Sequence, residues 1–408
     1  MNPVQTLRVA TRALIRNKLR AFLTTLGIII GVAAVIAMTA IGAGAKASIE
    51  SAFSAMGTDL LIVMPGSASS GGLRGGFGSM STLTWEDLST IRKEVPSVKL
   101  AAPALRSSLP VISEEQNWTT SVTGTSPEYF DIRNWPMASG SAFTQSDVDG
   151  GTKVVVLGQT VVDKLFGANA NPVGTDVRIG QSPYRVVGVA AKKGQSAIGQ
   201  DYDDAAFIPV STFAHKVQGG LGNYLRGIIY AQAMPGQAAR AQEDVSLLLR
   251  DRHHIAQGSE DDFSIRNLTE VAGAMQEGTK TMTALLASVA AVSLLVGGIG
   301  IMNIMLVSVT ERTREIGVRM ALGAKPVHIL SQFLVEALTL ATAGGVIGIA
   351  LGVGVAKWLA TRFGWPMLVE PQIVVVAVVF SAFVGILFGL YPAGKAARLD
   401  PIDALRYE

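Results

Sequence analysis

The side chains that most often carry chemistry are few in this sequence. Histidine is the usual acid or base near neutral pH, and the chain has four: His215, His253, His254 and His328. His253 and His254 are adjacent, and adjacent side chains on a helix point apart, so we expect both to lie in a solvated turn. The chain has no cysteine, which excludes catalytic thiols, disulfides and cysteine-ligated zinc.

Motifs for nucleotide binding and hydrolysis are also missing from the 408 residues. The sequence has no phosphate-binding loop of the form G-x-x-x-x-G-K-S/T, no G-x-S-x-G, no H-E-x-x-H and no G-x-G-x-x-G. We therefore predict that the chain is not an enzyme and holds no cofactor and no metal. Its net charge of +3 gives no reason to expect nucleic acid as a partner.

One charged segment, Glu311–Ala324, has a pattern suited to binding another protein. It predicts a short helix that ends near Gly323, because glycine favours a helix C-terminus, and Pro326 starts the next helix. Ile316 and Met320 form a small apolar ridge, four residues apart. We expect this ridge to fill a groove on a soluble partner. A solvated loop whose charges only set the membrane topology is the alternative.

The elements that must position this segment are membrane helices. The chain is 49% hydrophobic and 16% charged, against about 25% charged residues in soluble domains, and its mean hydropathy is +0.38. A helix needs about 20 apolar residues to cross a bilayer. Four segments without Lys, Arg, Asp or Glu are long enough: Ala21–Ala45, Thr281–Thr310, Ala337–Ala356 and Pro371–Gly394. The first exceeds the apolar part of a signal peptide, about 7–15 residues, so we interpret it as a retained anchor.

Lys and Arg in the short flanks of these segments predict the orientation, because they concentrate on the cytoplasmic side. Basic residues stand before the first segment, between the second and third, and after the fourth. We therefore expect a cytoplasmic (inner) membrane protein with both termini in the cytoplasm and residues 46–280 outside it. The basic residues are Arg8, Arg12, Arg16, Lys18, Arg20, Arg312, Arg314, Arg319, Lys325, Lys395, Arg398 and Arg406.

These limits divide the chain into residues 1–45, 46–280 and 281–408. The first part combines an amphipathic helix near residues 4–22, lying in the inner headgroup layer, with the first transmembrane helix. A basic flank that only sets topology is the alternative to that interfacial helix. The third part holds transmembrane helices 2–4 and the Glu311–Ala324 helix. Apolar residues at helical spacing continue beyond the end of the first span and precede the start of the second. We therefore expect these two helices to extend outside the membrane as a paired stalk. The alternative is that they are ordinary helix ends packed under the outer domain.

Residues 46–280 have the pattern of a mixed α/β domain with two subdomains. Two strand–helix–strand sets stand near its ends, and we expect them to build one small sheet with helices on one side. Thr84 and Asp87 predict the start of one such helix. Residues 109–216 contain further strands and are expected to form an inserted subdomain. The predicted fold class is an α-helical membrane protein with four transmembrane helices and a large extracytoplasmic mixed α/β domain on a helical stalk.

Glycine recurs every four positions in the membrane segments, at Gly27 and Gly31 and at Gly344, Gly348 and Gly352. Small residues at this spacing let helix backbones approach closely in lipid, so we predict that these five pack helices together. The alternative is that glycine is simply common in membrane helices.

Two polar residues stand in or beside the spans, Asn303 and Glu336. Polar side chains are costly in lipid, so we expect both to face protein or the membrane interface. A substrate-binding role is the alternative. Outside the spans, a Gly/Ser-rich loop at residues 66–82 indicates flexibility, with no role that the sequence identifies.

Five segments spread along the chain add a different kind of information: Asn17–Val32, Asn171–Gly174, Tyr184–Val189, Glu311–Ala324 and Asp400–Leu405. Each resembles a signature of the MacB-like and FtsX-like permease superfamily of ABC transporters, and together they follow its order along nearly the whole chain. Asp400 and Pro401 also have the pattern of a helix start, with Asp400 as the N-cap and Pro401 as the first helical residue.

The resemblance implies a homodimeric permease whose membrane helices relay ATPase closure mechanically to the periplasmic domain. ATP would be bound by a cytoplasmic ABC ATPase. Macrolide exporters of this superfamily carry a fused ATPase, whereas we expect a separate ATPase chain here. A periplasmic adaptor and an outer-membrane channel are partners that the sequence leaves open. The residues expected to contact the ATPase are Glu311, Arg312, Thr313, Arg314, Glu315, Ile316, Gly317, Arg319, Met320, Gly323 and Ala324.

Two functions are consistent with this resemblance. One is the export or extrusion of cargo, and the other is FtsX-like signalling, in which the ATPase state reaches an extracytoplasmic partner without transport. Neighbouring genes separate the two: an adaptor gene favours export, and a cell-wall hydrolase gene favours regulation.

Overall fold

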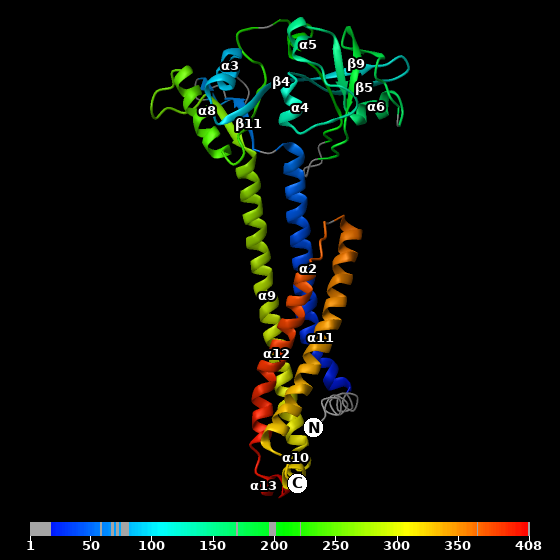
Figure 1. Cartoon of the computed structure of the whole chain (residues 1–408), viewed down its shortest axis with the longest axis vertical. Helices are drawn as coiled ribbons and strands as arrows, with labels where there is room; N and C mark the ends of the chain where they lie inside the picture. Colours follow the sequence, from blue (N-terminus) through cyan, green and yellow to red (C-terminus); the bar gives the residue numbers. More distant parts are fainter. Residues whose placement is uncertain are drawn as a thin grey trace. The chain divides into compact units, whose positions relative to one another are not determined.

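The computed structural model of the chain (Figure 1) describes residues 18–57, 59–66, 69–70, 73–74, 81–168, 170–195, 201–220, 222–364 and 366–406. The chain divides into two compact units: a membrane unit of residues 1–48 and 276–408, and an α/β unit of residues 49–275. Most of the predicted interfacial helix, residues 4–17, lies outside the described residues, as does much of the Gly/Ser-rich loop at 66–82.

Among the described residues, four helices are long and apolar enough to cross a bilayer, in agreement with the four predicted spans. The candidate spans are Thr25–Ser51 within α2 (Lys18–Met56), α9 (Leu268–Glu311), α11 (Pro326–Phe363) and α12 (Pro371–Ala397). Two short helices also belong to this unit, α10 (Thr313–Ala321) and α13 (Pro401–Arg406). Helices α11 and α12 begin with proline, which lacks the N–H that a first helical turn leaves unbonded.

Both α2 and α9 continue as single helices beyond the apolar segments from which they were predicted. Helix α9 starts directly after strand β12 (Phe263–Asn267), with no linker residue between them. The side-chain oxygen of Asn267 caps the helix by accepting hydrogen bonds from the backbone N–H groups of Thr269 at 3.0 Å and Glu270 at 3.3 Å.

The five glycines predicted to pack helices all lie where two helices meet. A Cβ atom on any of them would come too close to a neighbouring helix, so only glycine fits without a shift. The nearest atoms to such a Cβ are the Gly297 Cα at 2.8 Å for Gly27, the Leu294 Cγ at 2.8 Å for Gly31, the Ile28 Cγ2 at 3.3 Å for Gly344, the Ile29 carbonyl oxygen at 2.9 Å for Gly348 and the Ala33 carbonyl oxygen at 2.7 Å for Gly352. Helix α2 therefore packs closely against both α9 and α11.

The α/β unit contains one ten-stranded sheet in the order β12-β1-β11-β4-β5-β10-β7-β9-β6, with β8 beside β4 and β9. Its strands are β1 (Leu60–Pro65), β4 (Val98–Ile112), β5 (Asn117–Thr125), β6 (Met137–Gly140), β7 (Val154–Leu157), β8 (Asp176–Ile179), β9 (Ser182–Ala190), β10 (Ala205–Pro209), β11 (Ile228–Ala233) and β12. Strands β2 (Ser69–Ser70) and β3 (Leu73–Arg74) pair with each other. The helices are α3 (Trp85–Glu94), α4 (Glu128–Ile132), α5 (Gln145–Gly150), α6 (Gln159–Leu165), α7 (Val210–Lys216) and α8 (Ala238–Arg252).

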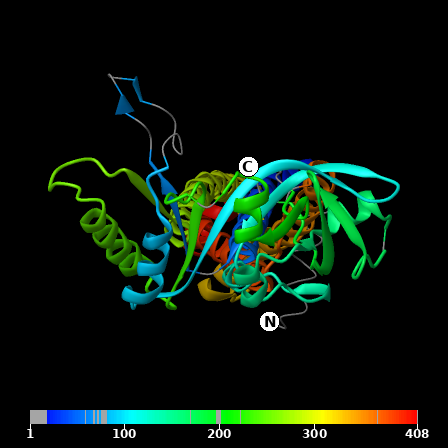
Figure 2. The ribbon, with the colours of Figure 1, turned by 90° about the horizontal axis from the view of Figure 1, so that it is seen from above.

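Strand β4 joins the two halves of this unit. Its first part pairs with β11, its end pairs with β8, and β5 runs beside it from Ala104 to Ile112. In Figure 2 these long strands, in cyan, cross from one half of the unit to the other. The four strands predicted in the two end sets are neighbours, in the order β12-β1-β11-β4, but they form one end of the ten-stranded sheet and not a small sheet of their own. The strands predicted for the inserted subdomain are present, but they belong to the same sheet because β4 is 15 residues long.

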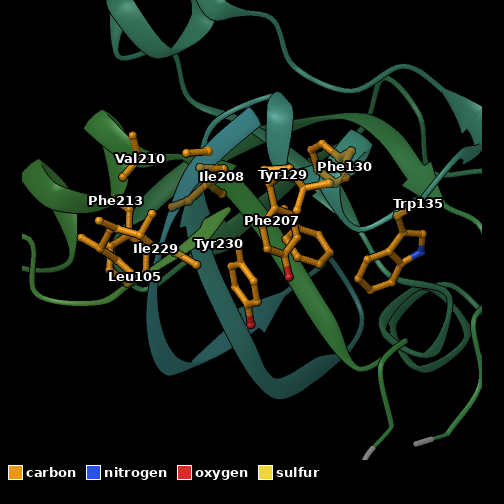
Figure 3. Close-up of a cluster of buried hydrophobic side chains, with 14 of the residues drawn as sticks. Leu105, Tyr129, Phe130, Trp135, Phe207, Ile208, Val210, Phe213, Ile229 and Tyr230 are labelled. Carbon is orange, nitrogen blue, oxygen red and sulfur yellow. The ribbon is translucent and has the colours of Figure 1, made fainter. Parts of the chain in front are cut away.

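An aromatic cluster forms the centre of the α/β core (Figure 3). The Phe207 ring lies 5.2 Å from Trp135, 5.4 Å from Phe130 and 5.5 Å from Tyr129, measured between ring centroids. The Tyr129 and Tyr230 rings are 5.4 Å apart, and their hydroxyl groups point to the same side in Figure 3. Aromatic side chains bury large apolar areas, so this cluster fixes α4 and β11 on β10.

Candidate coupling site

The charged segment after the second span folds as predicted, into a short helix followed by a glycine stop. Helix α9 ends at Glu311, and α10 runs from Thr313 to Ala321. Gly323 has a φ of +93°, a conformation that favours glycine, and the next backbone N–H, of Ala324, donates to the Arg319 carbonyl at 3.0 Å. This glycine stop turns the chain toward the start of α11.

One face of α10 is buried inside the membrane unit. Ile316 has no solvent exposure and belongs to an apolar core with Ile329 and Phe333 of α11. Gly317 faces α13 so closely that a Cβ atom on it would lie 2.8 Å from the Cβ of Ala404. Met320 is half-buried against the same core. The expectation that Ile316 and Met320 dock into a partner is therefore wrong for Ile316, because packing on α11 and α13 already occupies that face.

Charged side chains brace α10 and its junction with α9 on α11. Arg312, the residue between the two helices, pairs through Nη1 with the Glu336 carboxylate at 3.3 Å, and Glu336 is buried. Arg319 donates to the Gln332 side-chain oxygen at 3.2 Å and also pairs with Glu315 on its own helix. Glu336 thus faces protein, as expected. Arg312 and Arg319 stabilise the position of the segment and do not point freely at a partner.

The opposite face of α10 is exposed and partly apolar. Arg314 and Glu315 are exposed, and so are Val318 and Leu322, with Leu322 showing 84% of its surface. Apolar side chains from adjacent helices are exposed as well, at Ile402 and Leu405 of α13 and Val327 of α11. We call Arg314, Val318, Leu322 and Ile402 the outer face. Isolated exposed apolar residues are common, but several on helices in contact suggest a binding surface.

Sequence reasoning missed the outer face. Val318 and Leu322 lie four residues apart and so form an apolar pair, like Ile316 and Met320. The pattern contains two such ridges on different sides of one helix, and the sequence alone does not tell which one packs inward.

Asn303 in α9 is exposed within the membrane unit, so the described part of the chain does not bury it against protein. Its neighbours Ile299 and Val307 are exposed as well, at 45% and 42%. A polar amide facing lipid is costly, which makes this face of α9 a candidate contact with another protein.

The α/β unit contains a buried charge cluster that the sequence did not predict. Asp87 is buried and caps α3: it accepts hydrogen bonds from the Thr84 N–H and hydroxyl, both at 2.7 Å, which confirms the predicted capping pair. Its carboxylate also accepts from Arg252 Nε at 2.6 Å and His253 Nε2 at 3.2 Å. The other ring nitrogen of His253 lies 2.7 Å from an Asp262 carboxylate oxygen.

This cluster shifts the pKa values of its members in opposite directions. The hydrogen bond with Asp87, opposed by burial and helped by Asp262, raises the pKa of His253 to about 9. Burial alone would raise the pKa of Asp87, but hydrogen bonds from His253, Arg252 and Thr84 outweigh it and hold that pKa well below its usual range. His253 is therefore a half-buried, charged link between α8 and α3. The expectation of a solvated turn is wrong for His253, because two carboxylates enclose its ring.

Among the described residues, no group of three or more His, Asp or Glu side chains is arranged to hold a metal ion.

The described residues define a multi-pass membrane protein, with four candidate spans and an α/β unit between the first and second spans in the sequence. Family comparisons agree with this class. The family model of the MacB-like periplasmic core domain matches residues 21–247, and that of the FtsX-like permease C-terminal domain matches residues 287–401. The chain therefore belongs to the MacB-like permease family.

Relatives align along almost the entire chain. It is 41% identical to the macrolide export ATP-binding/permease protein MacB of Syntrophobacter fumaroxidans over 99% of this chain and 64% of that protein. It is 44% identical to the protein of the same name from Azoarcus sp. over 99% of this chain and 60% of the relative. The chain thus spans about three fifths of the length of these relatives. The crystal structure of the periplasmic region of MacB from Actinobacillus actinomycetemcomitans is 24% identical, with a TM-score of 0.44, over 55% of this chain and 95% of that one.

Proposed function

We propose that this chain is the permease subunit of an ABC transporter, driven by a separate cytoplasmic ATPase that binds ATP and docks on the outer face of α10. The observation that carries the proposal is that α10 is braced on α11 and α13 while it exposes Val318 and Leu322. A rigid helix with an exposed apolar ridge transmits displacement, because a push on the ridge moves the whole packed element. Permease relatives described as ATP-binding/permease proteins support an ATPase partner.

The route for movement would run from α10 into α9. Only Arg312 separates the two helices, and its ion pair with Glu336 ties that junction to α11. Helix α9 is a single helix that begins directly at strand β12 of the α/β unit. In the proposed route, α9 is the segment of chain that connects α10 to that sheet. Export or extrusion of cargo follows if the sheet acts on a substrate.

We place both termini in the cytoplasm and residues 46–280 outside it. The support is the distribution of Lys and Arg in the short flanks of the spans. The cytoplasmic side would then carry α10 and α13, where an ATPase can reach them.

We also propose that the chain works as a homodimer with the Asn303 face of α9 at the contact. Burial against a second copy would give the Asn303 amide a hydrogen-bonding partner, which lipid does not offer. Asn303→Cys in this cysteine-free chain should form a disulfide-linked dimer in oxidised membranes, whereas Val346→Cys on the exposed side of α11 should not. Equal cross-linking of both variants would reject this contact.

A photo-cross-linking amino acid at position 322 tests the ATPase contact, with position 368 as the control. Leu368 is also an exposed leucine, at 46%, and lies in the loop between α11 and α12, which the proposed topology puts on the opposite side. Irradiation of host membranes should link position 322, but not 368, to a protein that contains a phosphate-binding loop. Links to an ATPase at 368, or none at 322, would contradict the proposal.

FtsX-like signalling without transport is the second candidate, and the FtsX-like match of residues 287–401 favours keeping it. It shares the same ATPase contact. The two candidates differ in whether a substrate leaves the cell when the ATPase turns over, so efflux from cells that express both subunits separates them.

A further inference from the structure

A cleft in the α/β unit opens between the two halves of that unit and contains none of the coupling-site residues. Its volume is about 300 Å³, the lower end of the range for small-molecule pockets. Helix α3 contributes one wall, and α5 and the start of α7 contribute the other; Figure 1 places α3 and α5 in different halves of the unit. The lining residues are Trp85, Leu88, Ser89, Arg92, Lys93, Pro103, Ser126, Gln145, Val148 and Val210.

The cleft has cations and neutral polar groups in its lining but no carboxylate among the described residues that line it. Lys93 is exposed, and Arg92 keeps a third of its side chain exposed. The Arg92 guanidinium is held in place, because its Nε donates to the Ala101 carbonyl at 2.7 Å and its Nη2 to the Ser126 hydroxyl at 3.1 Å. Nη2 also pairs with Glu128 at 3.4 Å, beside the cleft. A fixed guanidinium and an exposed ammonium in the lining of one cleft suit an anionic group.

The rest of the lining is apolar or aromatic. Leu88, Val148 and Val210 are buried beneath the opening. The Trp85 indole N–H is buried and has no acceptor among the described residues. A buried donor without a partner in a native structure calls for an explanation, and an unseen water or ligand is a common one. A ligand with an apolar body would cover this part of the lining.

We propose that this cleft binds a small anionic amphipath: an apolar or aromatic body against Leu88, Val148 and Val210, with a carboxylate, sulfonate or phosphate group at Lys93 and Arg92. Both halves of the sheet contribute walls, so an occupant would couple the position of α3 to that of α5 and α7. The site goes beyond the proposed function and does not depend on it, because it lies in the α/β unit and needs neither ATP nor an ATPase.

Equilibrium dialysis of the full chain in phosphatidylcholine nanodiscs tests the site, with empty nanodiscs as the blank. The probe is naphthalene-2-sulfonate, and 2-naphthylmethylammonium is its counterpart of opposite charge. We expect saturable binding of the sulfonate at millimolar concentration or below, and no saturable binding of the ammonium. Absence of saturable sulfonate binding, or equal binding of the two probes, would overturn the proposal.

Two variants and a matched control locate the binding. Lys93→Gln should weaken sulfonate binding about fivefold, as expected for one partly exposed ion pair, whereas Lys99→Gln, which removes an exposed lysine outside the cleft, should not. Ser89→Phe should fill the cleft and abolish binding; Ser89 is only half-buried, so the larger side chain can be accommodated. Unchanged thermal unfolding of each variant establishes that it is folded. Equal affinity of the two lysine variants, or binding that survives Ser89→Phe, would place the probe elsewhere.

Discussion

Replacing His253 should remove a pH-dependent link between α3 and α8. The protonated ring lies between the carboxylates of Asp87 and Asp262, and His253→Phe keeps an aromatic ring while it removes both contacts. Asp87 then keeps only Arg252 and Thr84 as partners for its buried charge. We expect the start of α3 and the end of α8 to lose stability together.

The magnitude follows from the pKa. A rise from 6.5 to about 9 corresponds to about 3 kcal/mol at 1.36 kcal/mol per pKa unit. Asp262 is 41% exposed, so solvent screens part of this interaction, and we expect about 2 kcal/mol in practice. Because the folded pKa is raised, this stability is fully present below pH 6.5 and is lost as the pH rises through 9.

Hydrogen exchange gives a local measurement that does not require the membrane unit to unfold. Amide protection in α3 and at the end of α8, corrected for the intrinsic exchange rate at each pH, should fall between pH 6.5 and 9 in the wild-type protein. In His253→Phe, protection should already be low at pH 6.5 and should change little over that window. His254→Asn is the control, because His254 is exposed and has a φ of +53°, which asparagine tolerates.

The reasoning fails if the variant and the wild-type protein lose protection with the same dependence on pH. It also fails if His254→Asn changes protection as much as His253→Phe does, because the effect would then come from the turn and not from the charge cluster.

Three further predictions concern the membrane unit. Leu322→Asp should weaken association with the ATPase by tens to hundreds of times, because an unpaired carboxylate at a buried contact costs about 2–4 kcal/mol. Co-purification of the two proteins measures this association, and association equal to that of Leu368→Asp would count against the contact. Gly348→Leu should separate α2 from α11, because even a Cβ at this position would lie 2.9 Å from the Ile29 carbonyl oxygen. We expect a lower melting temperature, and an unchanged one would show that the helices adjust. Cysteine at position 99 should react with a membrane-impermeant thiol reagent in cells with an opened outer membrane, and cysteine at position 331 should not; labelling at 331 alone would reverse the orientation.

Local signals predicted the elements well. The four spans follow from uncharged apolar runs, the α3 start from Thr84 and Asp87, and the end of α10 from Gly323. Each of these depends on residues a few positions apart, so the chain carries the information within one turn or one span. Several strands of the α/β unit were predicted for the same reason.

Contacts between distant residues escaped prediction. Ile316 is buried in a core that includes Ile329 and Phe333 of α11, and its neighbour Gly317 packs against Ala404 of α13. No pattern within α10 predicts either contact. His253 meets Asp87 across 166 positions, so its neighbour His254 suggested only a turn. The single sheet also depends on distance, because β4 carries pairing from β11 at one end to β8 at the other.

The direct joint between β12 and α9 has a geometric consequence. Each residue of an α-helix advances the chain by about 1.5 Å and turns it by about 100°, so the 44 residues of α9 set the angle between side chains at the two ends of the helix as well as its length. A single inserted residue in the middle of α9 would rotate the side chains on one side of the insertion by more than a quarter of a circle, whereas an insertion of seven or eleven residues would restore their angle to within about 20°. Natural length variation in this helix should therefore favour insertions and deletions of seven or eleven residues.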